Sequence, residues 1–143
     1  MNKTNIRRLI RVLEGKEKLP GLNFNMGSYV YRPLDPDRAP HCGTCACIAG
    51  HAAILEAGYQ RAPRGKKIIR DLAEKSHETA ARWLGLSQID ANKLFFGWGR
   101  PHELVTYMEN ITKEHAVAAL KLLLKTGEVD WRTAIISVEH AHD

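Results

Sequence analysis

The residues best suited to chemistry are three cysteines, Cys42, Cys45 and Cys47, which lie within six residues of each other. Cys42 and Cys45 have the spacing of a zinc knuckle, and Cys47 lies four residues before His51. Thiolate and imidazole ligands suit zinc, but structural zinc sites usually join two separated chain segments. All four candidate ligands here lie within ten residues. We therefore expect no cofactor, and zinc held by Cys42, Cys45, Cys47 and His51 is the lesser alternative.

A nucleophilic thiol is the second chemistry that this segment could support. Thr44 is a predicted N-cap for a helix over residues 45–57, which places Cys45 at the helix N-terminus. Backbone N–H groups and the helix dipole lower a thiol pKa at that position. Cys45 is then the preferred catalytic candidate, with Cys42 as the second. A base would come from His41, His51, His102 or His115, and the sequence does not select among them.

The same segment resembles part of a known enzyme class. Cys42-Gly43-Thr44-Cys45 is similar to the stretch that ends in the nucleophile of papain-type proteases, although Ala46 stands where that family has Trp or Tyr. The rest of the family's pattern is missing. The simplest interpretation, which we favour, is that Gly43 forms a turn and that the cysteines are small buried apolar residues.

Lys and Arg residues form a second group of candidates. The chain has 21 Lys and Arg against 16 Asp and Glu, and this excess of five is too small to identify a nucleic-acid binder. One short cluster of Lys and Arg residues precedes a predicted helix and could hold an anion at the helix N-terminus. Its members are Arg61, Arg64, Lys66, Lys67 and Arg70. They predict a binding surface, and a solvated loop is the simpler alternative.

An acidic protein is the favoured partner for this cluster, and a nucleic acid is the alternative. Trp98, Arg100, Tyr29 and Tyr31 could stack on bases, but the sequence does not place them on one face. A lipid partner is not expected, because no apolar run approaches the roughly 18 residues of a membrane span. The oligomeric state stays open.

The elements that must position these residues are almost all helical. Apolar residues at helical spacing predict a first helix over residues 6–13 that ends at Gly15. The predicted helix at 45–57 is rich in alanine and glycine, so we expect it at the centre of the domain. Similar signals predict further helices over 69–84, 88–96, 104–108 and 112–126, while 131–142 is ambiguous between helix and strand.

Residues 15–41 are the exception. This segment contains several prolines and glycines and only one extended stretch, residues 28–31, so it predicts a long loop or a short hairpin. Long loops inside compact domains are often functional. The whole pattern predicts an all-α fold of about five or six helices in a single domain, residues 1–143. The cysteines are too few and too local for a disulfide framework, which predicts a cytoplasmic protein.

Two further segments carry a family resemblance. The first reads Cys42-Gly43-Thr44 followed by Cys47-Ile48-Ala49-Gly50, and the second begins at Ile111-Thr112 and ends at Thr126-Gly127-Glu128-Val129-Asp130-Trp131. Together they resemble a group of small uncharacterised proteins encoded by phages, prophages and bacteria. This sequence departs from that pattern at Cys45, where an apolar residue is usual, and at His51, where an aromatic residue is common.

That resemblance implies origin and fold more than activity. It leads us to expect a small cytosolic, phage-encoded binding protein that modulates a host or phage macromolecule without catalysis, with action against a host defence as one form. A cysteine-dependent hydrolase or transferase is the second hypothesis, and a zinc-stabilised adaptor is the third.

Overall fold

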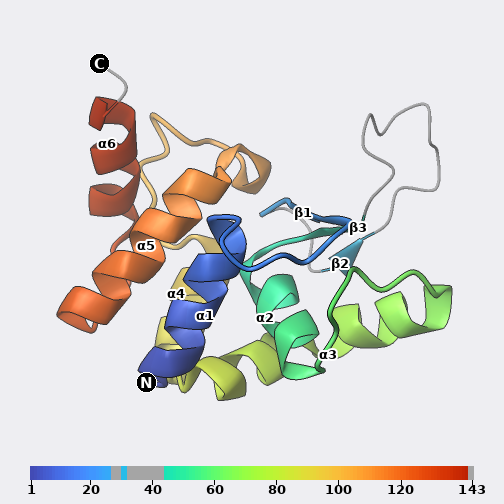
Figure 1. Ribbon diagram of the computed structural model, residues 1–143. Coiled ribbons are helices and arrows are strands. Elements are labelled where there is room, and N and C mark those ends of the chain that lie inside the picture. The colour runs from blue at the N-terminus through green and yellow to red at the C-terminus, as the bar shows by residue number, and fades with distance from the viewer. Residues whose placement is uncertain (27–29, 32–43, 142–143) are drawn as a thin grey trace, which may run out of the picture.

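The computed structural model describes residues 1–26, 30–31 and 44–141, with the backbone alone at 30–31 and 44–45. Within these ranges six α-helices form most of the regular structure, so the predicted all-α class is confirmed (Figure 1). Three short strands and one turn of 3₁₀ helix accompany them. In chain order the elements are α1 (Lys3–Leu13), β1 (Leu22–Phe24), β2 (Val30–Tyr31), β3 (Thr44–Ala46), α2 (Ile48–Glu56), α3 (Lys66–Leu84), α4 (Gln88–Phe96), η1 (Met108–Asn110), α5 (Lys113–Thr126) and α6 (Trp131–Ala141).

Helix α2 is the central element, as its small residues predict. Every residue from Ile48 to Leu55 is buried, and the helix packs against α1, α3 and α4. Ala49 and Ala52 have no exposed surface. Because a methyl side chain extends so little from the helix, the neighbouring helices can approach α2 closely on several sides.

The predicted start of this helix is wrong. Residues 44–46 form strand β3, and Cys47, not Thr44, is the N-cap of α2. Strand β3 lies between two partners, parallel to β1 and antiparallel to β2. This pairing on both sides holds the backbone of Thr44 and Cys45 extended, and the helix begins only after it.

The small sheet accounts for part of the segment predicted as a long loop or short hairpin. Its order is β1-β3-β2, so β1 and β2 each pair with β3 and not with each other. The extended stretch predicted at 28–31 is confirmed at Val30–Tyr31, and β1 was not predicted. Much of the segment, residues 27–29 and 32–41, lies outside the described residues.

Three other helices follow their sequence signals closely. Helix α3 ends at Gly85, α4 ends at Gly97, and α5 runs from its cap at Thr112 to Gly127. Gly85 has a φ of +67°, and a Cβ there would lie 2.7 Å from the backbone nitrogen of Asn2. That close approach lets the Asn2 N–H donate to the Leu84 carbonyl, which joins the end of α3 to the start of α1.

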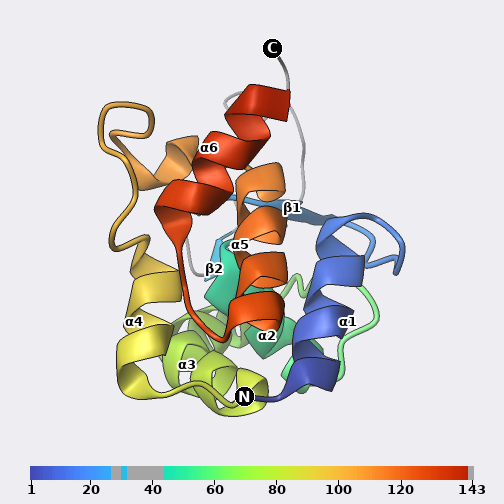
Figure 2. The ribbon, with the colours of Figure 1, turned by 90° about the vertical axis from the view of Figure 1, so that its left-hand side faces the viewer.

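The C-terminal part resolves one ambiguity and corrects one prediction. Residues 131–141 are helical, and α6 packs on α5, which also contacts α1 (Figure 2). The short helix predicted over 104–108 is wrong, because the segment there turns and only Met108–Asn110 forms a 3₁₀ turn. None of the described helices is long and apolar enough to cross a membrane.

Candidate functional site

Cys47 is a structural residue at the start of α2. Its Sγ accepts a hydrogen bond from the Gly50 N–H at 3.5 Å, in the position where Ser or Thr usually caps a helix. The side chain is 2% exposed, and this burial raises the pKa of the thiol to about 11. A neutral, enclosed thiol is a poor nucleophile and a poor zinc ligand.

The side chains of the other two cysteine candidates are not among those that the structure describes. Cys45 belongs to β3, so it is not at the helix N-terminus that the thiol hypothesis requires. Cys42 and His41 lie outside the described residues. Among the described side chains, no group of three His, Cys, Asp or Glu residues is placed to hold a metal ion.

His51 lies one turn inside α2 and is 3% exposed. Its Nδ1 lies 2.9 Å from the Cys47 carbonyl oxygen, which can only accept, so Nδ1 carries the proton and Nε2 carries a lone pair. Burial lowers the pKa of His51 to about 4, and the nearby Lys113 acts in the same direction. His51 is therefore a neutral imidazole at physiological pH.

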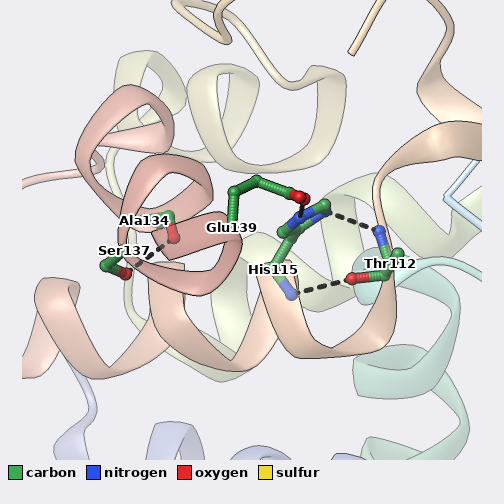
Figure 3. A network of polar contacts seen from close by, with 5 residues as sticks. All are labelled: Thr112, His115, Ala134, Ser137 and Glu139. Atoms are coloured by element: carbon green, nitrogen blue, oxygen red, sulfur yellow. Dashed lines mark hydrogen bonds and ion pairs between the residues drawn. The ribbon is translucent and has the colours of Figure 1, made fainter. Parts of the chain in front are cut away.

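His115 is equally buried but has both ring nitrogens occupied (Figure 3). The Thr112 N–H donates to Nδ1 at 3.0 Å, while the Thr112 hydroxyl accepts from the His115 N–H at 3.1 Å. Nε2 then holds the proton and donates it to Glu139 on α6 at 2.8 Å. This network caps α5 and joins it to α6. It leaves His115 no nitrogen for a substrate.

The cationic cluster lies at the start of α3. We call it the basic end, and it comprises Arg61, Arg64, Lys66, Lys67 and Arg70, all of which are exposed. Gly65 is the N-cap, with no side-chain cap and no acidic residue in the first helical turn. Ala62 and Pro63 are buried, and the Ala62 N–H donates to the Pro20 carbonyl. Arg61 and Arg64 thus flank two buried residues, one of which is hydrogen-bonded to the loop after α1.

Two of the residues proposed to stack on bases, Trp98 and Arg100, lie in the loop after α4 and not at the basic end. The guanidinium of Arg100 donates to the carbonyl oxygens of Phe96, Gly97, Val105 and Thr106 at 3.2 to 3.5 Å. It closes the loop after α4, where Trp98 is 53% exposed and contacts the Phe96 ring. Tyr29 lies outside the described residues, and only the backbone of Tyr31 is described.

A cleft of about 850 Å³ lies where the loop after α1, strand β1 and the first turn of α5 meet. His51 forms part of its wall, together with residues that the sequence analysis did not single out. Among these are Asn23, Phe24, Asn25 and Lys113. The unusual length of the segment at 15–41 was the available signal, since residues from 15 to 25 supply much of the lining.

Comparison of this chain with protein-family models, with curated proteins and with solved structures finds no match. The resemblance to small phage and bacterial proteins therefore remains a prediction.

Proposed function

We propose that this chain is a binding protein without catalytic activity that docks through its basic end onto an acidic surface of another protein. The observation that carries the proposal is the grouping of five exposed cations around an anchored helix start. A phage origin and a modulatory role, including action against a host defence, would fit such a protein and rest on the sequence resemblance alone.

The electrostatics of α3 favour an anionic partner. The N-terminus of a helix carries a partial positive charge, and anions near it are stabilised. Here no acidic side chain occupies the first turn, and Lys66 and Lys67 add full charges to that end. The first backbone N–H groups of α3 have no side-chain acceptor at Gly65. A carboxylate from a partner can therefore approach both the cations and the helix end.

The shape of the basic end favours a macromolecule over a small anion. In Figure 1 the N-terminal half of α3 lies on the side of the molecule opposite α5 and α6. Ile68, within the cluster, is 43% exposed and packs over Gly65. A projecting surface that combines charge with an apolar contact is suited to a partner's broad face.

An acidic protein accounts for these residues better than a nucleic acid does. Single-stranded nucleic acids are usually bound by cations that alternate with aromatic stacking platforms. Trp98 lies in the loop after α4, and the Arg100 guanidinium is committed to backbone carbonyls. The described part of the basic end itself contains no aromatic residue.

Charge reversal at the basic end tests the proposal. The probe is a fluorescein-labelled oligoglutamate peptide, and its affinity is measured by fluorescence anisotropy. We expect Arg64→Glu, Lys66→Glu and Lys67→Glu together to weaken binding by about tenfold or more, because attraction becomes repulsion. The matched control is Lys3→Glu, Arg7→Glu and Lys125→Glu, which changes the net charge equally at exposed positions outside the basic end.

Two results would overturn the proposal. One is equal weakening in the control variant, because the peptide would then respond only to net charge. The other is tighter binding of duplex DNA than of the peptide, with a salt slope near −0.9 per phosphate contacted, which would favour a nucleic-acid partner. Retained thermal stability in both triple variants shows that the fold is intact, since exposed substitutions usually shift stability by no more than about 0.5 kcal/mol.

A further inference from the structure

The cleft beside β1 is independent of the basic end and has the size of a small-molecule site. Pockets that enclose drug-sized ligands usually span roughly 300 to 1,000 Å³, and this cleft measures about 850 Å³. Its walls come from three separate parts of the chain. They are the end of α1 with its following loop, strand β1 with Asn25, and the segment from Glu109 to Glu114, with His51 of α2 between them.

His51 gives this cleft a hydrogen-bond acceptor of defined type. Because its Nδ1 proton is donated to the Cys47 carbonyl, its second nitrogen presents a lone pair. Nε2 of His51 is not a fully enclosed atom that lacks a partner. Among the described residues, the one such side-chain nitrogen or oxygen belongs to His77. The small exposed part of His51 lines the cleft, so a ligand in the cleft can donate to Nε2.

Aromatic and aliphatic side chains surround this acceptor. The Phe24 ring lies 5.9 Å from the His51 ring, centroid to centroid, at an angle of 43°. Leu13 and Ile111 are buried in the adjoining walls. Two tilted rings and apolar walls favour a flat, largely apolar body that can contact ring faces and edges.

The charges that line the cleft are balanced. Glu17 is paired with Arg8 at 3.0 Å and with Arg11 at 3.6 Å. The remaining charged lining residues are Lys18 and Lys113 against Glu109 and Glu114. The start of α5 is capped within the chain by Thr112 and carries Glu114 in its first turn, so it is not an anion site. A ligand without net charge fits these surroundings best.

We propose that the cleft binds a neutral, planar nitrogen heterocycle of indole or nucleobase size, whose ring N–H donates a hydrogen bond to Nε2 of His51. Phe24 and the apolar walls contact the ring. The amide of Asn23, which also lines the cleft, supplies a polar contact for ring substituents. The heterocycle can be a free metabolite or a group on a larger molecule.

A pair of probes that differ only in the donor tests this proposal on the unaltered protein. Indole carries one ring N–H, and 1-methylindole replaces it with a methyl group. Binding is followed by amide chemical-shift changes in ¹H–¹⁵N spectra. We expect saturable binding of indole with shifts at residues 23–25 and 111–113, and about tenfold weaker binding of 1-methylindole, since one hydrogen bond is lost and the His51 acceptor is left unpaired.

A protein variant provides the complementary test. His51→Phe keeps a ring in place but removes the lone pair, so it should bind indole and 1-methylindole with equal affinity. Lys125→Ala, at an exposed position outside the cleft lining, should retain the preference for indole. If His51→Phe proves too unstable, the probe pair on the unaltered chain decides alone.

Three results would overturn the proposal. They are the absence of saturable binding by both indole and adenine, equal affinity of the unaltered protein for each N–H compound and its methylated partner, and shifts confined to the loop around the exposed Trp98. A nucleobase ligand is separated from an indole-type ligand by repeating the titration with adenine and with 9-methyladenine, which lacks the ring N–H. A preference for either N–H compound over its methylated partner supports the proposal and identifies the ring type.

Discussion

The starts of α2 and α5 are built alike, but the buried histidines there use their ring nitrogens differently. Each begins with a side-chain cap, and each buries a histidine to 3% exposure within its first turns. At α5 the ring of His115 binds the Thr112 N–H and Glu139, so both nitrogens serve the fold. At α2 the His51 ring lies against the backbone of Cys47 and Ala46, with Nδ1 donating to the Cys47 carbonyl, and our proposal assigns Nε2 to the ligand in the cleft.

This difference shows that burial alone does not separate a structural histidine from a binding one. The exposed fractions of the two side chains are the same, and only their hydrogen-bond partners distinguish them. A buried ring with one nitrogen uncommitted beside a cleft can recognise a ligand, whereas a ring with two internal partners cannot do so without breaking a bond.

The largest expected effect concerns the charge state of His51. Its pKa is lowered from 6.5 to about 4 in the folded chain, so the fold favours the neutral ring. The contribution of the neutral His51 ring to the free energy of unfolding is fully present above pH 6.5. It is lost as the pH falls toward 4, because His51 in the unfolded chain takes up a proton first. We expect the free energy of unfolding to drop by about 2 to 3 kcal/mol between pH 7 and 4.5, measured by urea unfolding.

His51→Gln is the control for this loss. Glutamine retains an N–H donor for the Cys47 carbonyl but has no charge to gain, so its stability should depend much less on pH over the same window. The pKa values of Glu14, Glu103 and Asp130 are also lowered in the folded chain, so acid removes their stabilising effect too, but it does so equally in His51→Gln and in the unaltered protein. An unchanged pH slope in His51→Gln would show that other groups cause the loss.

The next effect tests whether α2 is enclosed on all sides. Ala49→Leu or Ala52→Leu should each destabilise the protein by roughly 1 to 3 kcal/mol, because the added atoms must displace packed neighbours. Ala57→Leu, at the exposed end of the same helix, should change stability by no more than about 0.5 kcal/mol. Thermal unfolding of the three variants measures the difference, and equal melting temperatures would place α2 outside the core.

The helices were predictable because their signals are local. Apolar spacing and glycine stops place the ends of α1, α3 and α5 correctly, whereas α1 and α3 begin at Lys3 and Lys66, before the predicted residues 6 and 69. The capping box of α5 was missed, since its second member is His115 where Glu or Gln is usual.

The start of α2 was not predictable from local signals. Thr44 is a good N-cap by residue type, but it pairs with Leu22 of β1, and the next two residues of β3 pair with both β1 and β2. Those partners lie more than a dozen residues away, and propensity does not register such long-range pairing. The cleft was missed for the same reason, because its walls come from segments as distant as Leu13 and Lys113. The exposed cations of the basic end were found, since charge clusters are visible in sequence.

The smallest effect concerns the cap of α5. Thr112→Ala removes the oxygen that accepts from the His115 N–H, and we expect a loss of about 1 kcal/mol in the free energy of unfolding. Thr112→Ser keeps that oxygen and should cost only a few tenths of this amount. Urea unfolding at pH 7 resolves the two variants from the unaltered protein.

Glu139→Gln changes the other hydrogen-bond partner of His115, so it separates the contribution of that contact to stability from the contribution of the cap. The Glu139 side chain is 50% exposed, and a glutamine oxygen can still accept from Nε2, so we expect a loss of no more than about 0.5 kcal/mol. A larger loss in Glu139→Gln than in Thr112→Ala would mean that the hydrogen bond to Glu139 of α6, and not the cap, secures the start of α5. His115 would then act chiefly as a link between the two helices, and the likeness between the starts of α2 and α5 would be limited to burial.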